Sequence, residues 1–207
     1  MNMKPLSPVP DVLERLRSGQ VVLVADGASR ENEVDAIVSA ELATPATIGW
    51  MVRHTSGLLC APMPPSYTAA LALPPLVARS EDPRATAYTV TVDARAVTAA
   101  GGTGISATDR ARTVNVLADP SSGPGDLARP GHILPLRSHP LGLDGRRGHT
   151  EAAVELLLLA GLRPVGVLAE LVDDQGEMRR LAEVRSDPLF ADMALTTVDA
   201  VVRYLSR

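Results

Sequence analysis

The sequence predicts a single α+β domain, an α/β-type arrangement in which helices flank a mixed β-sheet. The 207 residues suffice for one ample domain and are too few for two of full size. Two short apolar runs, Val21–Ala25 and Leu58–Met63, are typical of strands buried on both faces. The Thr86–Asp93 segment alternates and is rich in β-branched residues, which predicts a strand with two different faces. Helical segments separate these strands, so we expect a mixed sheet with helices on its faces.

The first residues are expected to form a flexible tail over residues 1–10, followed by one domain over residues 11–207. The tail contains three prolines and lacks the apolar core of a signal peptide. Asp11 is the expected N-cap of a first helix, which Gly19 ends.

Capping residues locate the helices in the middle of the chain. Thr44 and Pro45 predict the start of a second helix, because proline is favoured at the first helical position, and Gly57 lies beyond its end. Ser106 is the expected N-cap of a helix that runs towards Leu117.

The C-terminal third continues the alternation. The Ala/Leu-rich segment His149–Ala160 predicts a helix that ends at Gly161, and Val165–Val172 predicts a strand followed by a turn at residues 174–176. From Pro188 onward the pattern predicts a helix, a short strand and a final helix.

Composition excludes several classes of function. The net charge of −4 and an aromatic content of 2% disfavour a nucleic-acid-binding protein. Cys60 is the sole cysteine, so neither an intrachain disulfide nor a cysteine-based zinc site can form. The longest aliphatic run, Leu156–Ala160, is far shorter than the ~20 residues of a membrane span. We therefore expect a cytoplasmic protein without nucleic-acid or membrane partners.

The densest polar cluster is the Arg30–Asp35 segment, which directly follows the first buried strand. If the segment is extended, Glu31, Glu33 and Asp35 share one face, and three such carboxylates favour a bound cation or a raised pKa. A solvated edge strand or turn is the alternative. Its position at the end of an apolar strand, where open α/β sheets bind ligands, favours a site.

Two further clusters begin helices. Arg146–Glu151 combines two arginines, a hydroxyl and the free N–H groups of a helix start, which together suit an anion. Within it, His149 is a candidate metal ligand or proton carrier, although His149 or Thr150 serving only as a cap is equally compatible. The Gly-rich loop at residues 101–106 is a weak signal, because it has neither a Walker lysine nor a dinucleotide fingerprint.

Two isolated residues complete the candidates. His132 stands in a turn before an apolar stretch, where a lone histidine is more often structural than catalytic. Glu170 interrupts an apolar strand, and a carboxylate is costly to bury there unless it is paired or functional.

Five segments, taken together, point to a known family. They read SRENEVD, TGISATDRART, RPGHILPLR, RRGHTEAAVELLLLAGLRPVGVLAEL and DDQGEM. Their order and spacing resemble 3,4-dihydroxy-2-butanone 4-phosphate synthase of riboflavin biosynthesis, from about Asp11 to the C-terminal tail. The length is similar to that of the stand-alone synthase, without the GTP cyclohydrolase II half of fused versions.

The resemblance implies a homodimeric lyase with its sites near the dimer interface. It would convert D-ribulose 5-phosphate to L-3,4-dihydroxy-2-butanone 4-phosphate and formate with Mg²⁺ or Mn²⁺, and residues 11–207 would be its catalytic domain. Such a site suits Mg²⁺, which retains waters and takes up substrate oxygens. A metal that chelates the ketose oxygens would acidify the C3 proton and stabilise the resulting charge.

The resemblance also assigns the site residues. Glu31 and His149 are the implied metal ligands, and His132 and Glu170 fall on essential positions. Asp35, Glu33 and Glu170 are available as acid/base groups. The implied substrate-binding residues are Arg30, Glu31, Asp35, Cys60, Arg146, Arg147, Gly148, His149, Thr150 and Glu170, to which we add Thr103 and Ser106 as phosphate contacts at a helix start.

Three departures from the family pattern leave alternatives open. Gly27, Ala28 and Ser29 replace acidic residues of the loop that helps close the family's site, Val34 replaces a glycine, and Gly102 stands where one of two adjacent threonines is usual. These changes put rate or substrate in doubt. The alternatives are a diverged paralogue that acts on a related sugar phosphate, and a catalytically dead binding subunit. Five retained residues argue against the dead subunit: Glu31, Asp35, His132, His149 and Glu170.

Overall fold

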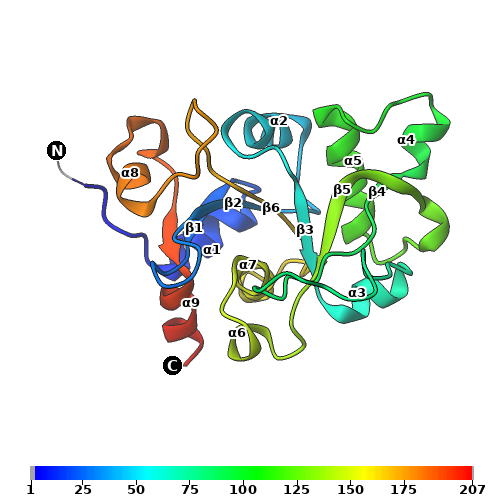
Figure 1. Cartoon of the computed structure of the whole chain (residues 1–207). Coiled ribbons are helices and arrows are strands. Elements are labelled where there is room, and N and C mark those ends of the chain that lie inside the picture. Colours follow the sequence, from blue (N-terminus) through cyan, green and yellow to red (C-terminus); the bar gives the residue numbers. More distant parts are fainter. Residues whose placement is uncertain (1–2, 207) are drawn as a thin grey trace.

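The computed structural model describes residues 3–206, and within them seven strands form one mixed sheet (Figure 1). The strands are β1 (Val22–Ala25), β2 (Val34–Ser39), β3 (Cys60–Met63), β4 (Val92–Ala94), β5 (Leu127–Arg137), β6 (Gly166–Glu170) and β7 (Leu195–Thr197). Their spatial order is β4-β5-β3-β6-β2-β1-β7. The pairs β1·β7 and β3·β5 are parallel, and the other pairs are antiparallel. The predicted α+β class with a mixed sheet is confirmed.

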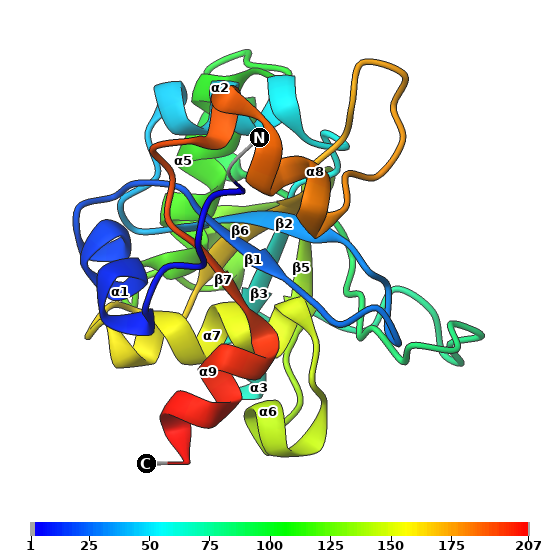
Figure 2. The same ribbon diagram turned by 90° about the vertical axis from the view of Figure 1, so that its left-hand side faces the viewer.

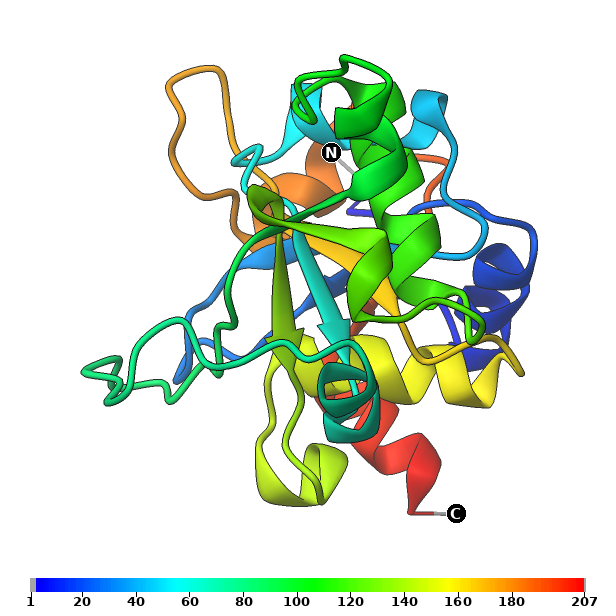
Figure 3. The same ribbon diagram turned by 90° about the vertical axis from the view of Figure 1, so that its right-hand side faces the viewer.

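Helices cover both faces of the sheet (Figures 2 and 3). They are α1 (Val9–Arg17), α2 (Pro45–His54), α3 (Pro65–Ala70), α4 (Arg95–Ala99), α5 (Ala107–Ala118), α6 (Gly142–Gly145), α7 (His149–Leu159), α8 (Leu181–Ser186) and α9 (Val198–Leu205), with short 3-10 turns at Pro124–Asp126 and Pro188–Phe190. The helices α2 and α5 pack on one face, and α1, α7 and α9 pack on the other. None of the helices described here is long and apolar enough to cross a membrane.

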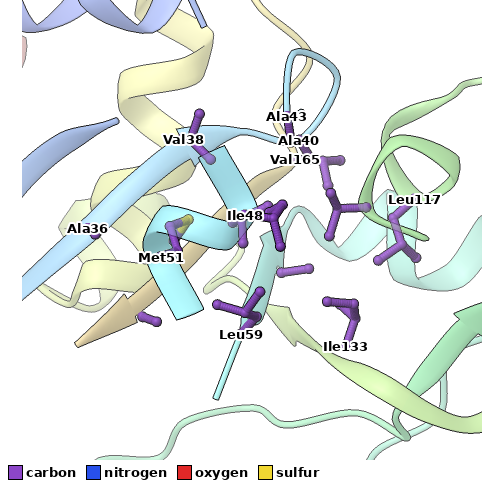
Figure 4. Close-up of a cluster of buried hydrophobic side chains, with 14 of the residues drawn as sticks. Ala36, Val38, Ala40, Ala43, Ile48, Met51, Leu59, Leu117, Ile133 and Val165 are labelled. Carbon is purple, nitrogen blue, oxygen red and sulfur yellow. The ribbon is translucent and has the colours of Figure 1, made fainter. Parts of the chain in front are cut away.

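The apolar strands build two cores, one on each face. In β1, Leu23 and Ala25 face the core under α2 and α5, whereas Val22 and Val24 face the core under α1 and α7. Figure 4 shows part of the first core, where Ile48 and other buried side chains gather around α2. The prediction that β1 is buried on both faces is confirmed, and this burial fixes the strand ends that carry the polar residues.

Several predicted helix boundaries are confirmed. The Thr44 hydroxyl accepts the N–H of Thr47 at the start of α2, and the Ser106 hydroxyl accepts the N–H of Asp109 at the start of α5. Helix α7 begins at His149, and Gly161 beyond its end has a φ of 72°, a conformation that glycine adopts without a steric penalty. The C-terminal order of helical turn, strand and helix is also as predicted.

The N-terminal prediction is partly wrong. Helix α1 starts at Val9 with Pro8 as its N-cap, not with Asp11. The backbone N–H of Lys4 donates to the carbonyl of Arg185 and that of Ser7 to the carbonyl of Leu195, so both residues contact the domain, and the flexibility of the tail stays a prediction. Residues 1 and 2 of the predicted tail, like residue 207, lie outside the described residues.

The sheet differs from the prediction at two places. The predicted Thr86–Asp93 strand is regular only from Val92, because Tyr88 and Thr89 form isolated bridges to two different partners, Leu136 and Pro75. Strand β2 was not predicted as a separate element, because its first residues belong to the charged cluster.

Candidate active site

A cavity of about 190 Å³ opens at the edge of the sheet where β1 and β6 end and β2 begins. It lies between side chains from six separate segments of the chain. Its lining consists of Arg30, Glu31, Glu33, Asp35, Cys60, Thr86, Tyr88, Leu136, Arg146, His149, Thr150, Leu168 and Glu170. Nine of these residues were predicted as site residues, and four were not: Thr86, Tyr88, Leu136 and Leu168.

The turn between β1 and β2 places the acidic residues. Its centre is Asp26, whose carboxylate accepts the N–H groups of Glu31 and Glu33, both at 2.9 Å. Asn32 has a φ of 58°, a left-handed conformation that asparagine tolerates better than most residues. Residues 30–33 therefore belong to a turn, and the extended conformation considered for Arg30–Asp35 is wrong for them and correct only from Val34, where β2 begins. Glu31 and Glu33 still reach the same cavity as Asp35, and Arg30 reaches it as well.

Asp26, Glu31 and His149 form a group that could hold a metal ion. One ligand atom from each residue lies within 4.8 Å of the others. His149 Nδ1 is 3.8 Å from Glu31 Oε2, and the buried Nε2 of His149 has no hydrogen-bond partner in the described part of the chain. Sequence reasoning missed Asp26, although its position directly after a buried strand was the available signal.

The environments of the ionisable groups differ in a way that suits a cation. Burial lowers the pKa of His149 to about 4, which leaves a neutral imidazole able to bind a metal at neutral pH. Burial opposes ionisation of Asp26, but hydrogen bonds from the N–H groups of Glu33 and Glu31 outweigh it and lower the pKa of this carboxyl. The cluster thus offers a charged carboxylate and a neutral imidazole.

Two carboxyl groups that line the cavity, those of Asp35 and Glu33, have the opposite pKa shift. Burial, reinforced by the negative charge of Glu170, raises the pKa of Asp35 well above its ordinary range. Burial and the charge of Glu31 also raise the pKa of Glu33. Asp35 and Glu170 are paired residues of the neighbouring strands β2 and β6, which is why their charges interact. The raised pKa values make Asp35 and Glu33 candidates for proton exchange with a ligand.

Glu170 and Cys60 complete the floor of the cavity. The Ser56 hydroxyl donates to Glu170 Oε2 at 2.7 Å, so this carboxylate is held at the end of β6. Burial raises the pKa of the Cys60 thiol. Cys60 is therefore an uncharged thiol. It contributes to the shape of the cavity and does not act as a nucleophile.

Arg146 faces the cavity with its side chain fixed by three acceptors. Its Nε donates to the carbonyl of Arg84, and its two Nη atoms donate to Glu151 and to the Thr86 hydroxyl, all at 2.9–3.0 Å. A guanidinium has five N–H donors, so two remain for a ligand. This arrangement explains why Thr86 belongs to the site.

Two guanidinium groups converge on the start of α7. A Cβ added to Gly148 would lie 2.5 Å from Arg146 Nη1 and 2.8 Å from Arg30 Nη2. The glycine lets both arginines approach a helix N-terminus, where N–H groups and the helix dipole favour an anion. Thr150, in the first turn of the helix, lines the same cavity. Arg147 is exposed and does not line it.

A second polar cluster lies outside the cavity. His132 Nδ1 is 2.8 Å from Asp93 Oδ2, and Gly104 packs so closely that a Cβ there would lie 2.1 Å from the same oxygen. The loop that contains Thr103 and Ser106 therefore sits beside His132 and not beside Arg146. Within this chain the phosphate contacts predicted for this loop are separate from those predicted for the start of α7.

Comparison with known proteins agrees with the resemblance seen in the sequence. The family model described as 3,4-dihydroxy-2-butanone 4-phosphate synthase matches residues 10–204. The riboflavin biosynthesis protein RibBA of Salinispora arenicola is 48% identical over 205 residues, which are 99% of this chain and 48% of that protein. The 3,4-dihydroxy-2-butanone 4-phosphate synthase of Pyricularia oryzae is 51% identical over 180 residues, 87% of this chain and 76% of that protein. The chain thus spans about half the length of the RibBA relatives.

Solved structures of similar sequence have the same fold. A 3,4-dihydroxy-2-butanone 4-phosphate synthase in complex with two magnesium ions superposes with a TM-score of 0.88 at 44% identity, covering 97% of both chains. The synthase of Candida albicans superposes with a TM-score of 0.89 at 42% identity, covering 100% of both.

Proposed function

Because the chain belongs to the 3,4-dihydroxy-2-butanone 4-phosphate synthase family, we propose that it is a lyase of riboflavin biosynthesis. It converts D-ribulose 5-phosphate to L-3,4-dihydroxy-2-butanone 4-phosphate and formate. The observation that carries the proposal is one cavity that joins a group able to bind a cation, two converging arginines and carboxyl groups with raised pKa values.

The residues present fit a divalent cation. Glu31 and His149 hold it, with Asp26 beside them, and Nδ1 of the neutral His149 imidazole faces the Glu31 carboxylate at 3.8 Å. We propose Mg²⁺ or Mn²⁺, since carboxylate oxygens with room for waters suit both ions. The related synthase solved with magnesium ions supports the first of them. When bound, the cation polarises oxygens of the substrate and makes the adjacent C–H more acidic.

The protein groups around the substrate move its protons. The reaction removes the C3 proton, expels water from C1 and releases C4 as formate, so it needs groups that both accept and donate protons. Asp35 and Glu33 have raised pKa values, which suits them to exchange protons with the substrate. Glu170, held by Ser56, lies opposite Asp35 and supplies a third acid/base group.

The substrate phosphate lies at the start of α7. Arg146 is oriented by Glu151 and Thr86 and keeps two free donors for phosphate oxygens. Thr150 and the N–H groups of the first helical turn add neutral donors. Binding of the phosphate at this point would direct the sugar carbons towards Glu31 and Asp35.

The active protein is a homodimer in which each site uses residues of both subunits. His132 falls on an essential position by resemblance, and the loop at residues 103–106 was predicted to contact phosphate from its place at a helix start, yet neither lines the cavity of its own chain. A second copy that places this cluster over the cavity would bring them to one substrate. Leu58 beside the cavity and Ile105 in the loop expose 53% and 51% of their surface, which suits a subunit contact.

Formate release by the purified full chain tests the function. We expect turnover of D-ribulose 5-phosphate with Mg²⁺ and none with the Glu31→Ala variant. Turnover with a different sugar phosphate alone would establish the diverged paralogue, and no turnover with any would establish a binding subunit. The enzyme is expected to act in the cytoplasm, without nucleic-acid or membrane partners.

A further inference from the structure

Three successive backbone carbonyls of the β1–β2 turn accept hydrogen bonds from arginine side chains of distant segments. Arg180 Nη1 donates to the carbonyl of Glu31 at 3.0 Å and to that of Asn32 at 2.7 Å. Arg84 Nη2 donates to the carbonyl of Arg30. The two arginines are 149 and 54 residues away from their acceptors. The turn that carries the metal ligand is thus held from outside by other parts of the fold.

The opposite side of the turn is held by Asp26. Its carboxylate accepts the N–H groups of Glu31 and Glu33. These N–H groups are therefore bonded within the turn, whereas the carbonyls of residues 30–32 are bonded by arginines from other segments. This pairing matters because Gly27, Ala28 and Ser29 are exposed and small, and give the turn little packing of its own. Ordering such a segment costs conformational entropy, which the hydrogen bonds offset.

The backbone N–H of each arginine is itself hydrogen bonded to a nearby carboxylate. Arg180 is the N-cap of α8, and its backbone N–H donates to Glu183 Oε2 at 2.6 Å. The backbone N–H of Arg84 donates to Asp82 Oδ1 at 2.9 Å. Figure 2 shows α8 above the start of β2, and the loop that carries Arg84 projects on the same side as the turn. Neither arginine lines the cavity, so neither contacts the substrate there.

We infer that Arg180, assisted by Arg84, is a positioning residue that fixes the backbone of the turn, so that the Glu31 carboxylate, which Arg30 contacts directly, stays in reach of His149. The side chain of Glu31 projects from the residue whose carbonyl Arg180 holds, and its Oε2 lies 3.8 Å from His149 Nδ1. If the turn loosened, a cation would have to order it on binding and would bind more weakly. The kinetic part of this inference rests on the proposed lyase function, whereas the metal-binding part does not.

The test is Mn²⁺ binding to the purified full chain, followed by the electron paramagnetic resonance signal of the free ion. We expect Arg180→Ala to weaken Mn²⁺ binding about tenfold, as loss of groups that orient metal ligands does. Arg180→Lys should restore most of the affinity, because an ammonium group can donate to both carbonyls. Arg84→Ala should weaken binding in the same direction. In formate release, Arg180→Ala should lower kcat, with KM for ribulose 5-phosphate within about twofold of wild type, since the phosphate contacts are intact.

Arg17→Ala is the matched control. Arg17 also donates to two backbone carbonyls, those of Ala160 and Leu159, but at the far end of α7. An Arg180→Ala protein with wild-type Mn²⁺ affinity, or an equal loss in Arg17→Ala, would overturn the inference. If circular dichroism shows that Arg180→Ala does not fold, Arg84→Ala decides, and unchanged affinity there overturns it. Weakened Mn²⁺ binding in Arg180→Ala, together with a wild type that releases no formate, would refute the proposed reaction and support the positioning role.

Discussion

Glu151 Oε2 lies 2.9 Å from Arg146 Nη1, and the other oxygen of the same carboxylate accepts the N–H of His139 at 3.0 Å. Glu151 is 1% exposed, so this carboxylate is removed from water and both of its oxygens are satisfied. The pair fixes the guanidinium before any ligand arrives. A binding group that is already oriented loses less entropy when the ligand binds.

Arg146→Ala should therefore weaken binding of ribulose 5-phosphate much more than binding of unphosphorylated ribulose. The loss should be about 1.5–3 kcal/mol, the contribution of a charge-assisted hydrogen bond. Calorimetric titration of both ligands measures the difference. Arg147→Ala is the control, because Arg147 is exposed and does not line the cavity. Equal losses for the two ligands would remove Arg146 from the phosphate site.

Glu31→Ala and His149→Ala should each abolish formate release and leave the fold intact. Glu31 is in a turn and His149 is at a helix start, so neither is part of the apolar cores. EDTA should silence the wild-type enzyme, and Mg²⁺ should restore it. Formate assays with circular dichroism spectra of the variants test this, and full activity of a metal-free sample would contradict the metal assignment.

Sequence patterns predicted the elements and residues that local chemistry determines. The caps at Thr44 and Ser106 were correct because a hydroxyl at a helix start satisfies a free N–H whatever the rest of the fold does. Glu31 and His149 were identified through motifs, and the structure places them in one cavity.

The misses share a physical cause, which is dependence on distant partners. Asp26 has its role because its carboxylate folds the following turn, and periodicity carries no signal for such a turn. Thr86 enters the site through a hydrogen bond to Arg146, 60 residues away. The position of His132 outside its own cavity depends on the packing of Gly104 against Asp93, which no local pattern encodes.

Asp35→Asn should abolish activity and make the protein more stable, by an amount that grows with pH. Below the ordinary carboxyl pKa of 3.8, Asp35 is protonated in both the folded and the unfolded chain. Its ionisation then has no effect on the free energy of unfolding. Above this pKa the unfolded chain ionises first, because burial raises the pKa in the folded state, so wild type loses stability as pH rises. Asparagine has no such loss. Urea unfolding in EDTA measures the free energy of unfolding of variant and wild type at pH 5 and pH 8. The difference between the two proteins should be larger at pH 8. An equal difference at both pH values would refute the raised pKa of Asp35.

Mixing two inactive variants should restore activity if the sites are shared between subunits. Glu31→Ala removes a group of the cavity, and His132→Ala removes a group of the cluster beside Asp93. A mixed dimer would contain one site with both groups intact, so unfolding and refolding the two variants together should recover up to about a quarter of the wild-type formate release, in line with random pairing of subunits. No recovery, with dimers demonstrated by light scattering, would place both groups in one chain.

Restoring acidic residues in the β1–β2 turn distinguishes an impaired synthase from a paralogue. Gly27, Ala28 and Ser29 are exposed and small, so this stretch next to the buried Asp26 should be mobile without ligand, and the enzyme should turn over slowly. Closing a flexible segment over a substrate costs roughly 1–2 kcal/mol for each residue fixed, and charged contacts offset this cost. Introducing Gly27→Asp, Ala28→Glu and Ser29→Asp together should therefore raise kcat on ribulose 5-phosphate. The opposite outcome is that kcat of the triple variant on ribulose 5-phosphate stays the same or falls, while the wild type turns over another sugar phosphate well. The small residues would then adapt the turn to that substrate, and the protein would be a paralogue of the synthase.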